Sequence, residues 1–117
     1  MSYTVKESKS FPRSASDMIA STSQALSALG GKLSRKSKPK AGYFDITFNK
    51  KINDKGQKRY INNRVQLHVK IQADSAEQSS LAVEAYPINP IGQKLMFGVR
   101  GKPARFVIDT FWAELEA

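Results

Sequence analysis

Chemical groups that many catalytic and metal sites require are scarce in this sequence. It has no cysteine and a single histidine, His68. The lack of cysteine excludes disulfides, thiolate nucleophiles and thiolate metal ligands, and it is compatible with a reducing compartment. With one histidine, a zinc site would need carboxylate-dominated ligands, so we expect neither a metal nor another cofactor.

Long apolar runs are also absent. No stretch approaches the roughly 20 apolar residues that a membrane-spanning helix needs. The N-terminal segment MSYTVKESKSF carries Lys6, Glu7 and Lys9 without a continuous apolar run, so it lacks the features of a signal peptide. We therefore expect a soluble, cytoplasmic protein with no membrane span.

Sequence motifs for catalysis are missing as well. There is no glycine-rich phosphate loop followed by Lys and Ser or Thr, and no Gly-x-Ser-x-Gly elbow. His68 is expected on the polar side of a strand beside Arg64 and Lys70, with no carboxylate spaced to orient it on its own face. A half-exposed structural histidine is the favoured interpretation over a general base, and we expect no enzyme. The GVRGK segment (98–102) could hold an anion at a helix N-terminus, but a turn that needs glycine explains it as well.

The composition of the 117 residues is that of a folded domain. Hydrophobic residues make up 40% of the chain and charged residues 25%, which is typical of globular proteins. A chain of this length removes roughly two-thirds of its unfolded surface from water. We therefore expect a single α+β domain over residues 1–117.

Helical spacing is clear in the segment PRSASDMIASTSQALSALGG. Ser14 can cap a helix that Gly30 ends in the left-handed conformation, and Asp17 can reach back to the cap. The stripe at helical spacing consists of Met18, Ile19, Thr22, Leu26 and Leu29. The sequence thus predicts a long N-terminal helix after a first strand over residues 3–11.

A period of two predicts four strands after this helix. In YFDITFNK (43–50), three apolar side chains alternate with polar ones, and NDKG (53–56) supplies the turn residues of a hairpin. The return strand is the clearest alternation, over residues 64–71. Two further strands are expected around residues 81–86 and 95–99, with turns at ADSAEQS and PINPIG.

A second helix is predicted at the C-terminal end of the sequence. In GKPARFVIDTFWAELEA, Pro103 suits a first helical position. The apolar face would comprise Ala104, Ile108, Phe111, Trp112 and Leu115. A strand over residues 105–108 is the alternative. The order strand, helix, four strands, helix predicts a two-layer α+β fold, in which both helices cover one face of an antiparallel sheet of about five strands.

This element order resembles that of the TATA-binding-protein-like and helix-grip folds. The segments SASDMIASTSQALSALGGKL and GYFDITF are similar to the opening helix and following strand of small bacterial domains of that kind. The resemblance implies a helix-covered antiparallel sheet. Because such folds include nucleic-acid binders, lipid carriers and enzyme subdomains, the resemblance leaves the function open.

Positive charge is concentrated in the middle third of the chain. Residues 32–70 contain twelve Lys or Arg and two Asp, and the whole chain has a net charge of +9. The segment GGKLSRKSKPKAG (30–42) has five cations and no acidic residue. Its Lys, Ser and Pro content predicts a basic mobile loop at residues 31–41, which either contacts an anion or only keeps the surface solvated.

The side of the sheet away from the helices is the candidate binding surface. It is expected to carry Tyr43, Tyr60, Arg64, Gln66, His68, Lys70, Tyr86 and Lys94. Single-stranded nucleic acid binds such surfaces because bases stack on rings while cations track phosphates. The residues expected to contact nucleic acid or another polyanion are Lys32, Arg35, Lys36, Lys38, Lys40, Lys50, Lys51, Lys58, Arg59, Arg64, Lys70, Tyr43, Tyr60, Tyr86 and His68. A non-enzymatic binding module is the leading hypothesis.

Two other functions compete with this hypothesis. A protein-interaction or structural module would use the same face to meet an acidic partner or a second copy of the chain, with Tyr and Arg as anchors. A small hydrophobic-ligand carrier would line a pocket with Phe44, Phe48, Phe97, Phe111 and Trp112. Aromatic rings at this spacing are more often ordinary core, which disfavours the carrier.

Overall fold

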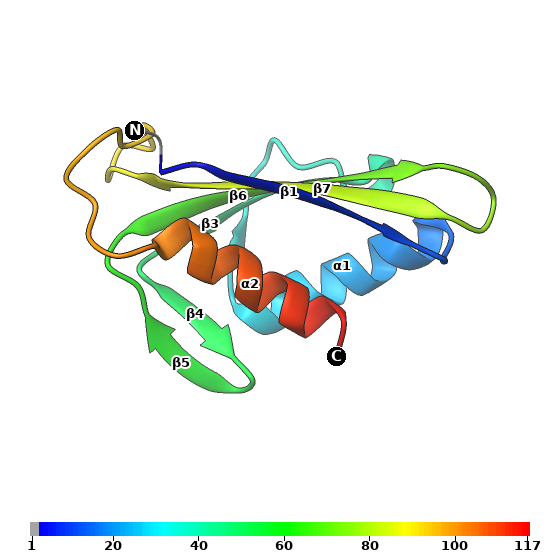
Figure 1. Cartoon of the computed structure of the whole chain (residues 1–117), viewed down its shortest axis with the longest axis horizontal. Helices are drawn as coiled ribbons and strands as arrows, with labels where there is room; N and C mark the ends of the chain where they lie inside the picture. Colours follow the sequence, from blue (N-terminus) through cyan, green and yellow to red (C-terminus); the bar gives the residue numbers. More distant parts are fainter. Residues whose placement is uncertain (1–2) are drawn as a thin grey trace.

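Helices and strands separate into two layers in the computed structural model, which describes residues 3–117 (Figure 1). The elements in chain order are β1 (Val5–Phe11), α1 (Ala15–Leu29), β2 (Lys32–Leu33), the 3-10 turn η1 (Pro39–Ala41), β3 (Tyr43–Phe48), β4 (Lys51–Asp54), β5 (Gln57–Tyr60), β6 (Arg64–Ala73), β7 (Ser79–Ile88) and α2 (Pro103–Leu115). Both helices lie on one face of the main sheet. The predicted α+β class is confirmed.

The main sheet has five antiparallel strands in the order β1-β7-β6-β3-β2. The ten-residue strands β6 and β7 lie at its centre. Residues paired across neighbouring strands share a face of the sheet. His68 is paired with Asp45 on β3 and with Glu84 on β7, and this register brings titratable groups of three strands together on the face opposite the helices.

Helix α1 begins and ends as its sequence predicts. The Ser14 hydroxyl accepts a hydrogen bond from the backbone N–H of Asp17 at 3.1 Å, and Gly30 ends the helix at φ +80°. Met18, Leu26 and Leu29 are buried against the sheet and α2. The apolar stripe therefore holds the helix against the rest of the core.

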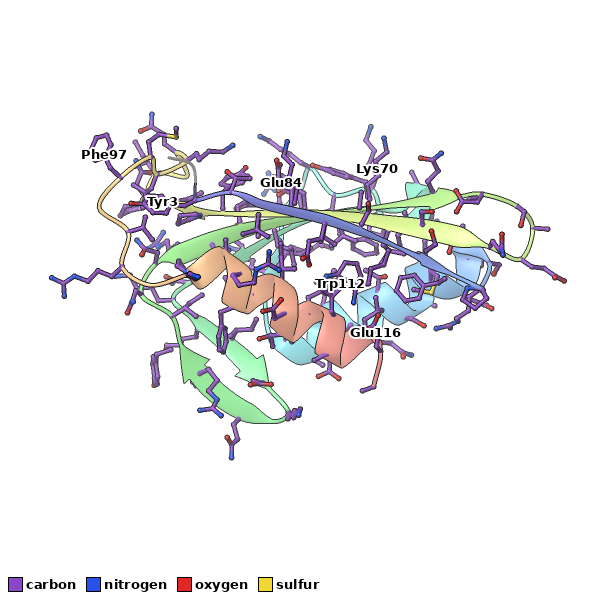
Figure 2. The ribbon with its side chains drawn as sticks, viewed as in Figure 1. Tyr3, Lys70, Glu84, Phe97, Trp112 and Glu116 are labelled. Atoms are coloured by element: carbon purple, nitrogen blue, oxygen red, sulfur yellow. The ribbon has the colours of Figure 1, made fainter. Side chains whose placement is uncertain are left out.

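Helix α2 starts at Pro103, so the alternative strand over residues 105–108 is wrong. Its Val107, Ile108 and Phe111 are fully buried. Figure 2 shows Trp112 pointing into the space between this helix and the sheet. No helix within residues 3–117 has the length and apolar content needed to cross a membrane.

The predicted pairing of the strand at 43–50 with the return strand at 64–71 is present as β3 and β6, but the segment that contains NDKG forms an additional hairpin that was not predicted. Its turn joins β4 to β5, which form a separate two-stranded ribbon on the helix side of the molecule (Figure 1). The backbone leaves the direction of β3 at Lys50, where φ is +61°, and Ile52 is then buried in the core. Strand β3 pairs with β6, as predicted, and the ribbon lies outside the main sheet.

The predicted strand over residues 95–99 does not form. Only one isolated bridge, from Lys94 to Ile88, links this region to β7. Gly92 and Gly98 have positive φ, and Phe97 is 83% exposed. The alternation of apolar residues here does not produce a strand, and the fifth strand of the sheet is β2.

The predicted loop at residues 31–41 contains regular structure. Lys32–Leu33 pairs with β3, and Pro39–Ala41 forms the turn η1. Between them, the Ser37 hydroxyl donates a hydrogen bond to the Asp45 carbonyl at 3.1 Å and accepts one from the Asp45 backbone N–H at 2.9 Å. The loop prediction is therefore wrong for these residues, because β3 offers a free edge to which the segment bonds. Its mobility stays a prediction.

Candidate functional site

Polar side chains of four strands meet on the open face, the side of the main sheet away from the helices. One row across the sheet runs from Asp45 on β3 through His68 and Glu84 to Lys6 on β1. Lys6 and Glu84 form an ion pair at 3.3 Å. Figure 2 shows Lys70 and Glu84 on this side, opposite Trp112.

His68 is the centre of a hydrogen-bonded network on this face. Its Nδ1 lies 3.0 Å from the Tyr43 hydroxyl and 3.2 Å from Asp45 Oδ1, and its Nε2 lies 3.0 Å from the Tyr86 hydroxyl. A carboxylate can only accept hydrogen bonds, so we assign the imidazole proton to Nδ1. The Nε2 atom then accepts a hydrogen bond from Tyr86, and both ring nitrogens have partners.

Asp45 connects this network to the rest of the sheet. The residue is 4% exposed, and its Oδ1 also accepts a hydrogen bond from the Gln66 amide. The Gln66 carbonyl in turn accepts one from the Thr47 hydroxyl at 2.7 Å. The expectation that no carboxylate orients His68 is wrong, because the orienting group comes from the neighbouring strand and not from β6 itself.

Three rings form a diagonal row across β3, β6 and β7, which we call the ring row: Tyr43, His68 and Tyr86. The ring centroids of Tyr43 and His68 are 6.2 Å apart, and those of His68 and Tyr86 are 5.7 Å apart. The hydroxyl contacts join the rings at their edges. The Lys94 ammonium lies 4.5 Å from the centroid of the Tyr86 ring, a cation–π contact.

The two phenols of the ring row are held in their protonated form. Burial raises the pKa of Tyr43 and of Tyr86 above the usual value, and the negative charges of Asp45 and Glu84 raise both pKa values further. A phenol that resists deprotonation donates hydrogen bonds but is a poor nucleophile. The chemistry of the row thus suits binding better than covalent catalysis.

A shallow hollow of about 620 Å³ lies beside the ring row. It exists because Ser8 and Ala82 are small, whereas the surrounding positions carry larger side chains. These neighbours are Lys6, Tyr43, His68, Lys70 and Glu84. The hollow therefore offers two ammonium groups next to aromatic rings.

Several predicted site residues do come together on the open face. Tyr43, His68, Lys70 and Tyr86 lie on the three adjacent strands β3, β6 and β7. Lys32 shares this face because it is paired with Thr47. Arg64 lies toward one end of β6, where its guanidinium donates to the Pro90 carbonyl at 3.3 Å.

Other predicted contacts lie elsewhere. The ribbon of β4 and β5, with the residue before it, carries Lys50, Lys51, Lys58, Arg59 and Tyr60 on the helix side of the molecule. The prediction that Tyr60 shares a face with the other tyrosines is wrong, because the ribbon is not part of the main sheet. The segment between β2 and β3, at the edge of the sheet, carries Arg35, Lys36, Lys38 and Lys40, all exposed.

The sequence reasoning missed Asp45, Glu84, Lys6 and Ser8. The alternation of side chains along each strand puts all four on its polar side, which could have placed them on the open face. What this alternation could not show is the register of β3 against β6, or that β7 lies between β6 and β1. Metal binding has no support here: no three His, Asp or Glu residues within 3–117 are grouped so that they could hold an ion.

The aromatic set of the carrier hypothesis does not line one pocket. Phe44, Phe48, Phe111 and Trp112 belong to the core, where the Phe111 and Trp112 rings are 5.3 Å apart. Phe97 lies at the outside of the molecule, clear of both layers (Figure 2). The five side chains therefore cannot enclose one ligand.

Comparisons with known proteins give no family for the chain. No family model matches it, and no curated protein matches it. A crystal structure of an uncharacterised protein from Bacillus thuringiensis is similar, with a TM-score of 0.44 and 11% identity over 97% of this chain and 93% of that one. The crystal structure of Ara h 8.0201 has a TM-score of 0.41 and 11% identity, over 97% and 95% of the two chains. Similarities this distant identify neither a ligand nor a partner.

Proposed function

We propose that the open face binds single-stranded nucleic acid without catalysing a reaction. The observation that carries the proposal is the ring row, which lies beside Lys70 and Lys94 on a sheet face that no helix covers. Nucleic-acid bases stack on partly exposed aromatic rings, and ammonium groups contact the phosphates between them.

The hydrogen bonds of the ring row support this function. Both ring nitrogens of His68 are tied to a tyrosine hydroxyl, so the two phenol rings lose little freedom when a ligand arrives. A surface ordered before binding spends less conformational entropy on the complex. The uncharged phenols also avoid repulsion between a phenolate and the phosphates.

The electrostatics of the molecule favour the same ligand. The net charge is +9, and cations at Lys32 and Lys70 share the open face with the rings. Exposed cations attract a polyanion over a distance and raise its association rate. Binding of this kind weakens as the salt concentration rises, because phosphate contacts release counterions.

Fluorescence anisotropy with a labelled mixed-sequence single strand tests the proposal. Between about 50 and 200 mM salt, each phosphate contact contributes about −0.7 to the slope of log K against log salt. We expect Lys70→Ala to weaken binding and to make the slope of log K against log salt less steep by about 0.7, the contribution of one phosphate contact. The matched control Lys58→Ala, on the ribbon, should leave the slope unchanged. Equal effects of both variants, or no binding at low salt, would contradict the proposal.

A further inference from the structure

We propose that a second hollow, between β5 and the start of α2, binds an acidic peptide segment of a partner protein through one large apolar side chain and its neighbouring carboxylates. The hollow has a volume of about 390 Å³. Its lining includes Tyr60, Asn62, Arg100, Lys102, Arg105 and Phe106. None of these residues belongs to the open face, so the inference does not rest on the function proposed above.

Two aromatic side chains in this lining are left exposed by the fold. Tyr60 is 75% exposed, and Phe106 is 36% exposed although it lies on a helix whose other apolar residues are largely buried. Neither ring is needed to fill the core. Exposed aromatic groups at a concave site are typical anchors of protein interfaces, where they contact the buried side chain of a partner.

Positive charge at this hollow is available to a ligand. Arg105 is already engaged, since it donates to Glu7 at 2.8 Å and to Asp109 at 3.3 Å. Arg100 and Lys102, both exposed, come from the loop before α2. On the other side, the Lys51 ammonium lies 5.9 Å from the centroid of the Tyr60 ring. A carboxylate on either side of an apolar anchor would therefore meet a cation.

The loop that carries these cations bonds to the segment before β6. The Asn62 amide donates to the Arg100 carbonyl at 3.1 Å, and Gly101 adopts φ +70°, a conformation that suits glycine. The GVRGK segment and Tyr60, which the sequence analysis assigned to different roles, thus meet at one site. A site whose backbone already has these contacts requires little rearrangement of the backbone on binding.

The shape favours a peptide over a nucleic-acid strand. A concave site of this volume accepts one side chain with its neighbours, whereas single strands bind along extended grooves that track the backbone. An acidic peptide can place its charges next to the cations and its apolar side chain between the rings.

The proposal is tested by an amide-resolved NMR titration of the full chain with two probe peptides. Each is an N-acetylated heptapeptide of Asp and Glu, one with a central Trp and the other with a central Ala. We expect shifts at residues 60–62 and 100–106 with the Trp peptide, and binding that is about tenfold weaker for the Ala peptide, as for the loss of an interface anchor. A single-stranded heptanucleotide is titrated in parallel.

Variants identify the site and separate it from the open face. Tyr60→Ala and Lys102→Glu, both at exposed positions, should each weaken the Trp peptide by about tenfold, whereas Lys70→Glu should change its affinity by less than about twofold. Silence at about 1 mM peptide, a range that would still detect weak complexes, overturns the proposal. It is overturned equally if the heptanucleotide and not the peptide shifts these amides, or if Lys70→Glu is the damaging variant.

Discussion

The two faces of the main sheet are built from alternate residues of the same strands, yet different features of the chain specify them. On β6, Val65, Leu67 and Val69 are fully buried under the helices. Between them, Gln66 and His68 point the other way and bond to side chains of β3 and β7. The helix-covered face is specified by the apolar period of each strand, whereas the open face depends on which strands lie side by side.

The largest effect is expected on the helix-covered face. Leu67→Ala removes a side chain that is 0% exposed and leaves a cavity, which should lower the free energy of unfolding by about 2–5 kcal/mol. Urea denaturation measures the difference. Lys70→Ala, on the open face of the same strand, is the control and should stay within about 0.5 kcal/mol. Equal losses for both variants would remove the distinction between the faces.

The centre of the open face should also contribute to stability. Asp45→Ala leaves the Gln66 amide without its acceptor and the His68 Nδ1–H with the Tyr43 hydroxyl alone, which we expect to cost about 1–3 kcal/mol. Thermal unfolding at pH 7 checks this value. A variant as stable as the parent would mean that the network does not hold the strands together.

Removal of a buried hydroxyl on the helix side is expected to raise the stability of the fold. Thr22 is 0% exposed, and its Oγ1 has no hydrogen-bond partner within the part of the chain that the structure describes. Thr22→Val keeps the shape and removes an unsatisfied polar atom, so we expect a gain of about 1 kcal/mol. Destabilisation in urea denaturation would show that this hydroxyl is bonded in solution.

The pH dependence of stability reports on a third polar contact, at the edge of the helix-covered face. The Arg105 guanidinium and then the Trp112 indole N–H hold the pKa of Glu7 below its usual value. This carboxylate therefore stabilises the fold at pH values above its unfolded pKa, and the contribution is lost as the pH falls through the lower folded pKa.

Glu7→Gln tests this contact, because it removes the titration. The free energy of unfolding, measured in denaturant from pH 7 down to acidic pH, should fall less steeply for the variant than for the parent. The same dependence of stability on pH in both proteins would contradict a stabilising ion pair between Glu7 and Arg105.

The smallest effect is expected at the edge of the sheet. Charge reversal at Lys36 and Lys38, which are exposed between β2 and β3, should change the free energy of unfolding by less than about 0.5 kcal/mol. Thermal melts of the double variant measure it. A large loss would show that these side chains contribute to the order of the segment.

The sequence alone predicted the features that depend on local pattern. The capped helix α1, the proline-initiated α2 and the alternation of β3, β6 and β7 follow from caps and periods within one segment. The ribbon of β4 and β5 was not predicted, because the positive φ at Lys50 and the burial of Ile52 depend on the helices. The predicted return strand placed β6 beside β3, but the contact of Asp45 with His68 depends on the register of these two strands, which the pattern does not fix.

An amide-resolved NMR titration with a mixed-sequence single-stranded oligonucleotide tests the open face directly, at about 50 mM salt, where phosphate contacts are strong, and again at about 200 mM. We expect shifts at Tyr43, Lys70 and Tyr86 on the open face, fading at the higher salt concentration, while the ribbon residues Lys58 and Arg59 stay unchanged. Shifts confined to the ribbon, or none at the lower salt concentration, would contradict the claim that the open face is a nucleic-acid binding surface.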